Sequence, residues 1–134
     1  VYKRQLKEAV QNADLIQENA PENETLKKNL IKEISQYSKI NSIIASSSSG
    51  LLPSKIQSKC KNPKRLIIAH PFNPVYLLPL VELVAGKQTD KKFINKANIF
   101  YSNIGMKTLI LKKELPGYLS DRLQESMWRE SHYI

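Results

Sequence analysis

The spacing of hydrophobic and polar positions changes repeatedly along the chain. Apolar residues recur at helical intervals in some stretches and form short continuous runs in others. Helices are predicted over residues 2–12, from Pro21 onward, and over 53–59, 90–103 and 118–134. Strands are predicted over residues 15–18, 42–46, 65–70, 80–85 and 108–111. This alternation is typical of an α/β layer architecture.

Two of these segments carry more detailed expectations. In the helix after Pro21 we expect Glu22 and Glu24 in the first turn, where acidic groups suit the helix dipole. Three residues of this helix recur at i+4 and predict its buried face: Leu26, Leu30 and Ile34. The run 65–70 is apolar and β-branched, so we expect it to be buried on both faces, as in a parallel sheet.

Composition narrows the class of protein. Hydrophobic residues make up 41% of the 134 residues, enough for a core. No apolar run approaches the roughly 18 residues of a membrane helix. The single cysteine, Cys60, forms no internal disulfide and no cysteine cluster for a metal, so we expect a cytoplasmic protein without a metal site.

The net charge of +9 raises the possibility of a nucleic-acid partner. The lysines are scattered, however, and the arginines lie far apart in the sequence. We expect a small-molecule ligand and neither nucleic acid nor a membrane as partner. A basic nucleic-acid-binding module remains the non-enzymatic alternative.

His70 is the first candidate for chemistry, because it ends a strand that we expect to be buried. Ligands of open α/β sheets bind beyond the carboxyl ends of the strands. Glu82 lies in another apolar strand and needs a partner there, and His70 is the obvious one. A carboxylate bonded to one imidazole nitrogen makes the other a better general base. A purely structural histidine remains the alternative from spacing alone.

Ser49 follows a predicted strand within the run 46–50, SSSSG. This run lacks the Gly-x-Ser-x-Gly pattern of an exposed serine nucleophile. A hydroxyl that binds a substrate oxygen is the more modest role, and a flexible loop is the alternative. The glycines of the chain are too far apart to form a phosphate-binding loop.

Three motifs resemble the 3-hydroxyacyl-CoA dehydrogenase superfamily. Residues 69–84 read AHPFNPVYLLPLVELV, with a glutamate twelve positions after the histidine of a His-x-x-Asn-Pro turn. Residues 44–51, IASSSSGL, resemble the family's Ala-Ser-Asn-Thr-Ser-Ser-Leu segment. Residues 116–123, PGYLSDRL, resemble its Pro-Gly-Phe-x-x-Asn-Arg-Leu motif, with Asp121 in place of the asparagine.

Within the superfamily, residues 78–82 and 121–130 are most similar to the branch that oxidises L-carnitine. The L-gulonate dehydrogenase (lambda-crystallin) branch shares the piece Pro-Leu-Val-Glu and stays an alternative. A 3-hydroxyacyl-CoA substrate is the other alternative, made less certain by Asp121.

The resemblance implies a fold and an assembly. Residues 1–115 would be the C-terminal part of a Rossmann-like NAD-binding domain, and 116–134 the first helix of an all-α dimerisation domain. The chain would then be a fragment without the glycine-rich half, inactive alone, and its full-length protein a homodimer.

The resemblance also implies residue roles. His70 would take the hydroxyl proton, and Glu82 would orient it. Ser49, Asn73 and Asp121 would contact the substrate. Two residues would lie near the nicotinamide of NAD, Asn19 and Glu22. The trimethylammonium group of carnitine favours aromatic faces, for which the candidates are Phe72, Tyr76, Tyr118 and Trp128.

Overall fold

The computed structural model describes residues 2–134, with side chains from Gln5 onward. All the expected segments form, within a few residues of their expected ends. The helices are α1 (Tyr2–Val10), α2 (Glu24–Tyr37), α3 (Pro53–Ile56), α4 (Lys91–Asn103) and α5 (Ser120–Tyr133). The strands are β1 (Leu15–Glu18), β2 (Ile43–Ser46), β3 (Leu66–Pro71), β4 (Leu80–Ala85) and β5 (Lys107–Leu111), and two 3₁₀ turns cover Gln57–Lys59 and Pro63–Arg65.

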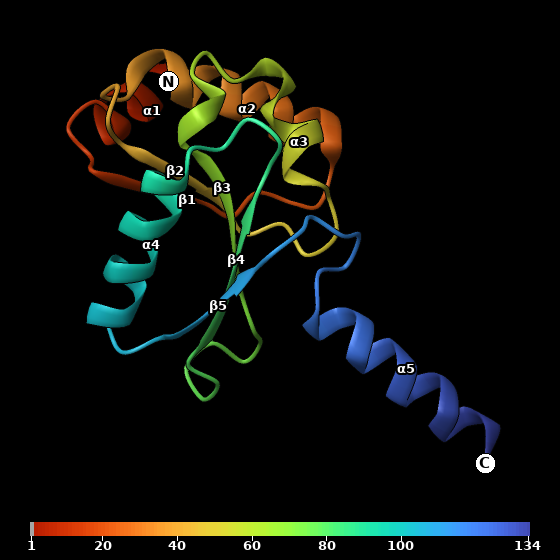
Figure 1. Cartoon of the computed structure of the whole chain (residues 1–134). Helices are drawn as coiled ribbons and strands as arrows, with labels where there is room; N and C mark the ends of the chain where they lie inside the picture. The colour runs from red at the N-terminus through yellow and green to blue at the C-terminus, as the bar shows by residue number, and fades with distance from the viewer. Residues whose placement is uncertain (1) are drawn as a thin grey trace.

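The five strands form one sheet in the order β1-β2-β3-β4-β5 (Figure 1). Strands β1, β2 and β3 are parallel, and β5 is parallel to β4. The expectation of parallel neighbours for β3 is only half correct, because β3 pairs with β4 in the antiparallel sense. A direct loop joins β3 to β4, whereas a parallel pair needs a longer crossover such as the one through α4.

Hydrophobic clusters cover both faces of this sheet, which is why the central strands β3 and β4 are mostly apolar. On one face, the sheet packs against α1, α2 and α3 through residues that include Ile31, Ile56, Ile68 and Val84. On the other face it packs against α4, as the second cluster shows: Ile43, Ala45, Ile67, Ala69, Val81, Leu83, Phe93, Ile94, Ala97 and Tyr101. The result is a layered α/β structure, as the alternation of elements predicts.

The start and the buried face of α2 differ from expectation. The helix begins at Glu24, because the side chain of Asn23 caps it by accepting from the Leu26 amide, so Glu22 lies before the first turn. Leu26 is 44% exposed, whereas Lys27 is only 1% exposed. The buried face therefore runs through Lys27, Ile31 and Ile34.

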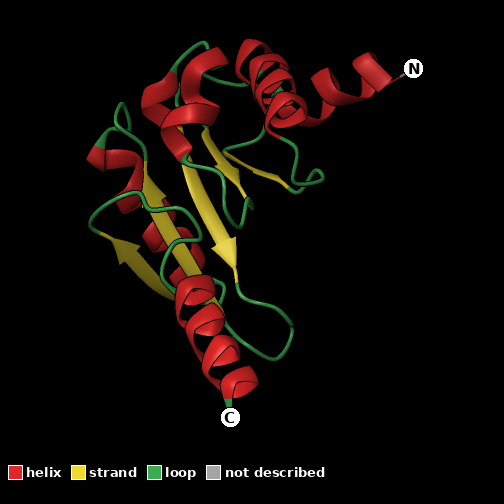
Figure 2. Ribbon diagram, turned by 90° about the vertical axis from the view of Figure 1, so that its right-hand side faces the viewer, coloured by secondary structure: helices red, strands yellow, loops and turns green. Residues whose placement is uncertain are grey.

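Helix α5 leaves the body of the molecule. It points away from the sheet in both ribbon views, and its end lies far from the amino-terminal end of the chain (Figures 1 and 2). None of its residues is buried. No helix in the described part of the chain is long and apolar enough to cross a membrane.

Candidate active site

The antiparallel pairing of β3 and β4 places His70 directly opposite Glu82. The His70 Nδ1 atom lies 2.9 Å from Glu82 Oε2, and both residues are buried. Both side chains lie on the sheet face that carries Ile68 and Val84, because alternate residues of a strand share a face. The expected contact between the two is therefore present, and the hairpin register is its cause.

The start of α5 holds Glu82 from the other side. The backbone amides of Leu119 and Ser120 donate to Glu82 Oε1 at 3.0 and 2.9 Å, and the Ser120 hydroxyl donates to Oε2 at 2.6 Å. Burial acts to raise the pKa of Glu82, but the hydrogen bonds from His70, Ser120 and the two amides outweigh it and lower that pKa. Glu82 is thus held as a carboxylate. Ser120 was not predicted as a site residue, because it lies near Glu82 only through the turn before α5.

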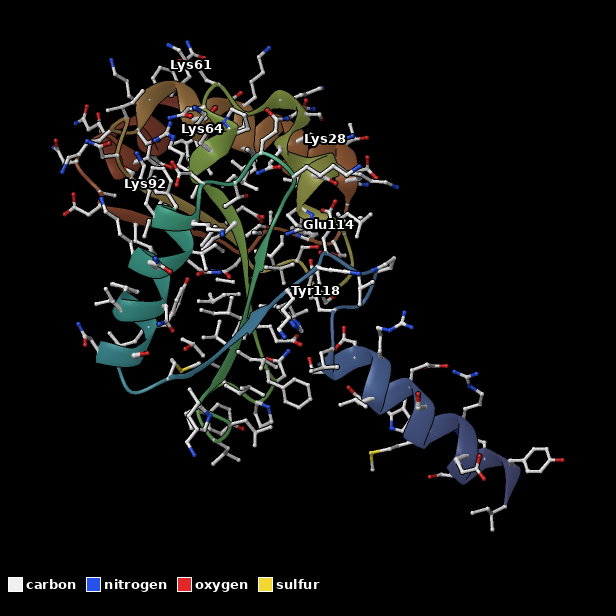
Figure 3. The ribbon with its side chains drawn as sticks, viewed as in Figure 1. Lys28, Lys61, Lys64, Lys92, Glu114 and Tyr118 are labelled. Carbon is white, nitrogen blue, oxygen red and sulfur yellow. The ribbon has the colours of Figure 1, made fainter. Side chains whose placement is uncertain are left out.

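Two consecutive left-handed residues make that turn. Gly117 has φ 70° and Tyr118 has φ 44°, a conformation that a bulky residue rarely adopts. Tyr118 is fully buried, its hydroxyl donates to the Leu51 carbonyl at 2.7 Å, and its ring lies 5.5 Å from that of His70. Figure 3 shows it between the sheet and the beginning of α5. Its packing fixes the turn that presents the two amides to Glu82.

A cavity of about 330 Å³ opens at His70. Four residues expected at the site line it: Ser49, His70, Asn73 and Asp121. Phe72 lines it as well, and so does Gln124, which the sequence analysis did not single out. Gln124 follows Asp121 by three positions on α5, so helical spacing was the signal that could have found it.

Asp121 faces this cavity as a half-buried carboxyl group. Burial raises its pKa, the nearby His70 acts in the opposite direction, and the negative charges of Glu82 and Glu22 raise it further. In the described part of the chain, Asp121 takes part in no side-chain hydrogen bond or ion pair. Its oxygens are thus available to a ligand in the cavity.

The two residues expected near NAD lie on different sides of the sheet edge. Glu22 accepts hydrogen bonds from the Ser48 hydroxyl and, at 3.1 Å, from the Gly50 amide, so it contacts the loop that carries Ser49. These bonds outweigh the effect of burial and lower the pKa of Glu22. Asn19 lines a separate cavity of about 330 Å³ with Tyr101, on the α4 side. The structure therefore does not bring Asn19 together with His70.

A buried ion pair that was not predicted from the sequence lies beside these loops. Lys27 Nζ contacts both carboxylate oxygens of Glu18 at 2.9 and 3.1 Å and donates to the Ala20 carbonyl at 2.8 Å. Glu18 also accepts from the Ser46 hydroxyl at 2.5 Å. Lys27 Nζ lies 3.7 Å from Glu22. Lys27 thus ties α2 to the loop after β1, and its partner Glu18 bonds the end of β2.

The four aromatic candidates are distributed unevenly. Phe72 lines the cavity at His70 and also a neighbouring one of about 440 Å³, which Trp128 and Met127 share. Tyr118 lies beneath His70 as part of the core. Tyr76 is 86% exposed, so it neither packs in the core nor lines one of the described cavities.

Comparison with known proteins identifies the family. Residues 1–115 match the family model described as 3-hydroxyacyl-CoA dehydrogenase, NAD binding domain. The chain belongs to the 3-hydroxyacyl-CoA dehydrogenase family. The matched residues include all five strands of the sheet and both His70 and Glu82.

Three similar proteins show which members of the 3-hydroxyacyl-CoA dehydrogenase family the chain resembles. The chain is 50% identical over 133 residues to the L-carnitine dehydrogenase of Bacillus cereus, covering 99% of this chain and 41% of that protein. It is 48% identical to the L-carnitine dehydrogenase of Pseudomonas putida, covering 96% of this chain and 40% of that protein. The crystal structure of (S)-3-hydroxybutyryl-CoA dehydrogenase from Ralstonia eutropha superimposes with a TM-score of 0.87 at 30% identity, covering 92% of this chain and 44% of that one. The chain thus spans about 40% of the length of the curated relatives that it matches.

Proposed function

We propose that the whole protein oxidises the 3-hydroxyl group of a short hydroxy acid with NAD, and that His70 is the general base. The observation that carries this proposal is the position of His70. Its ring lines the cavity, while its Nδ1 atom is bonded to the buried Glu82. Membership in a dehydrogenase family supplies the reaction class.

The proton transfer follows from the hydrogen bond between His70 and Glu82. Because Glu82 is a carboxylate, Nδ1 carries the hydrogen and donates it, which leaves Nε2 with a lone pair. Nε2 takes the proton of the substrate hydroxyl as the alcohol carbon becomes a ketone. Glu82 then stabilises the imidazolium, and the amides of Leu119 and Ser120 keep the carboxylate in place. NAD, when bound, would accept the hydride that leaves this carbon.

Ser49 and Asn73 line the same cavity as His70 and offer hydrogen-bonding groups to the reacting oxygen. We assign them to substrate binding, because oriented donors stabilise the charge that develops on this oxygen. Neither is assigned a nucleophilic role.

The polar groups at the carboxyl edge of β1 and β2 fit the nicotinamide half of NAD. The Glu22 carboxylate is 40% exposed and adjoins the Ser49 loop. Hydrogen-bond acceptors of this kind suit the carboxamide and ribose groups of a dinucleotide. We assign Glu22 to this contact. Asn19 would reach the cofactor only from the other side of the edge, so its part in binding stays a prediction.

L-Carnitine is the substrate that we propose within this class. The identities of 50% and 48% to two L-carnitine dehydrogenases support it over a 3-hydroxyacyl-CoA, since the acyl-CoA enzyme named above is 30% identical. Phe72 and Trp128 line adjoining cavities and offer aromatic faces for the methylated ammonium group. Turnover of L-carnitine, L-gulonate and 3-hydroxybutyryl-CoA, compared side by side, decides among the three.

The test of the general base is His70→Ala in the whole protein. We expect kcat to fall by about 10²- to 10⁴-fold, the usual contribution of a positioned base. NAD binding, followed by calorimetry, should stay largely unchanged. His132 is a matched control because it is exposed near the end of α5. Loss of less than fivefold for His70→Ala, or equal losses for His70→Ala and His132→Ala, would contradict the proposal.

We further propose that residues 116–134 begin a second, helical domain through which the whole protein forms a homodimer. The family match ends at residue 115, and α5 carries exposed Leu123, Met127 and Trp128. Apolar side chains on an otherwise unpacked helix are typical of a surface that another segment covers. Light scattering on the whole protein should give twice the protomer mass.

A further inference from the structure

The charges around the cavity at His70 are unequal. In the described residues, the cavity is lined by no lysine or arginine, and its other groups are the neutral Ser49, Phe72, Asn73 and Gln124. His70 is hydrogen-bonded to Glu82, and the Glu82 carboxylate also accepts from Leu119 and Ser120. Among the described residues that line this cavity, Asp121 is therefore the one charged group without a hydrogen-bond or ion-pair partner.

Arg122, the next residue, does not neutralise Asp121. It lines a hollow of about 560 Å³ with Glu125 and Arg129, which Asp121 also borders. Among the described residues, neither arginine forms an ion pair with Asp121. Burial raises the pKa of Asp121, His70 lowers it, and the negative charges of Glu82 and Glu22 raise it further. A carboxylate without a partner in a half-buried cavity is costly, and a cation bound beside it removes that cost.

We propose that Asp121 is a specificity-determining residue that selects a substrate with a cationic group next to the reacting carbon. This inference rests on the proposed function, because it places the substrate hydroxyl at His70. In carnitine the quaternary nitrogen is attached to the carbon beside the alcohol carbon. When the hydroxyl reaches Nε2, the positive charge must lie in or at the edge of the same cavity, facing Asp121.

The reaction itself strengthens this requirement. Proton transfer makes His70 an imidazolium next to an ammonium group that is already positive. Glu82 offsets the first charge, and Asp121 offsets the second. With a neutral residue at 121, no negative charge would offset the ammonium group. Binding would then be weaker, and the repulsion between the ammonium and the imidazolium would also slow the chemical step.

The test compares two substrates of the same shape. 3-Hydroxy-5,5-dimethylhexanoate replaces the quaternary nitrogen of carnitine by carbon, and keeps the hydroxyl and the carboxylate. For the unmodified whole protein with saturating NAD, kcat/KM should favour L-carnitine by about 10- to 100-fold, the size expected for one charge pair in a partly buried site. In Asp121→Asn this ratio should fall to about threefold or less, and Asp121→Glu should restore most of it.

Glu125→Gln is the matched control, since it removes one negative charge from the same helix at a residue that lines the other hollow. It should keep the ratio of the unmodified protein. The ratio is internal to each variant, so a partly unfolded preparation does not change it.

The outcomes separate the inference from the proposed function. If Asp121→Asn retains the ratio of the unmodified protein, or if that protein turns over both compounds equally well, Asp121 does not select charge, although the oxidation stands. If the unmodified protein oxidises neither compound, the proposed substrate is wrong and the inference falls with it.

Discussion

Glu82 accepts hydrogen bonds from both sides of the candidate active site. One oxygen receives the amides of Leu119 and Ser120, and the other receives His70 and the Ser120 hydroxyl. The four donors share the two carboxylate oxygens, so each oxygen accepts two hydrogen bonds. At the scale of the single residue, Glu82 therefore joins the hairpin of β3 and β4 to the start of α5.

Glu82→Gln should destabilise the protein and remove most of its activity. A glutamine keeps the shape of the side chain but offers one acceptor oxygen in place of two, so donors on one side lose their partner. We expect a loss of about 1.5–3 kcal/mol in the free energy of unfolding at pH 7, typical of hydrogen bonds to a charged group. The amide group also donates towards Nδ1, which moves the hydrogen of His70 to Nε2 and removes the base. Urea unfolding and kcat measure the two effects.

The difference between the unmodified protein and Glu82→Gln should depend on pH. Hydrogen bonds lower the pKa of Glu82 in the folded state below its ordinary 4.5, so the unfolded chain takes up a proton first as the pH falls. The stability due to the carboxylate is present above pH 4.5 and is lost as the pH drops through the lower, folded-state pKa. The two unfolding free energies should therefore converge in acid. A gap that stays constant from pH 7 down to pH 3 would contradict this cause.

At the scale of the element, α2 depends on a lysine that lies outside its predicted buried face. Lys27 is buried against Glu18 of β1 and contacts the Ala20 carbonyl. Lys27→Met should lower the unfolding free energy by about 3–5 kcal/mol, because it leaves the charge of Glu18 buried and unpaired. It should also raise KM for NAD, since the loops after β1 and β2 lose their common anchor.

A second change separates charge from packing at this pair. Lys27→Met combined with Glu18→Gln removes the stranded charge but keeps an oxygen for the Ser46 hydroxyl. The double variant should be more stable than Lys27→Met alone in urea unfolding. If the double variant loses as much unfolding free energy as the two single variants lose together, the two side chains do not act as a charge pair.

These two sites show what the sequence could predict. The pairing of His70 with Glu82 was predictable, because His70 ends one predicted apolar strand and Glu82 lies within the next, where it needs a polar partner. The family motifs then located Ser49, Asn73 and Asp121, which line the same cavity. The buried face of α2 was predicted wrongly, since Leu26 is exposed and Lys27 is buried. Periodicity treats every lysine as polar, and only the fold shows that Glu18 lies within reach.

At the scale of the whole molecule, stability should be divided between the layered body and α5. The strands are buried between two hydrophobic clusters, whereas no residue of α5 is buried. A helix of this length without tertiary packing is marginal in water. Its first turn is the exception, because Glu82 holds the amides of Leu119 and Ser120.

Amide hydrogen exchange on the 134-residue chain and on the whole protein measures this division. In the 134-residue chain, β3 amides should be protected by more than about 10³-fold, and those of residues 123–133 by less than about tenfold. Glu82→Ala, which removes both acceptor oxygens, should expose the amides of Leu119 and Ser120 to exchange without changing the rest of α5. In the whole protein, residues 123–133 should become protected, because a second domain would cover Leu123, Met127 and Trp128. Equal exchange of α5 in both proteins would mean that nothing packs on this helix, and the proposed helical domain would have to bind elsewhere.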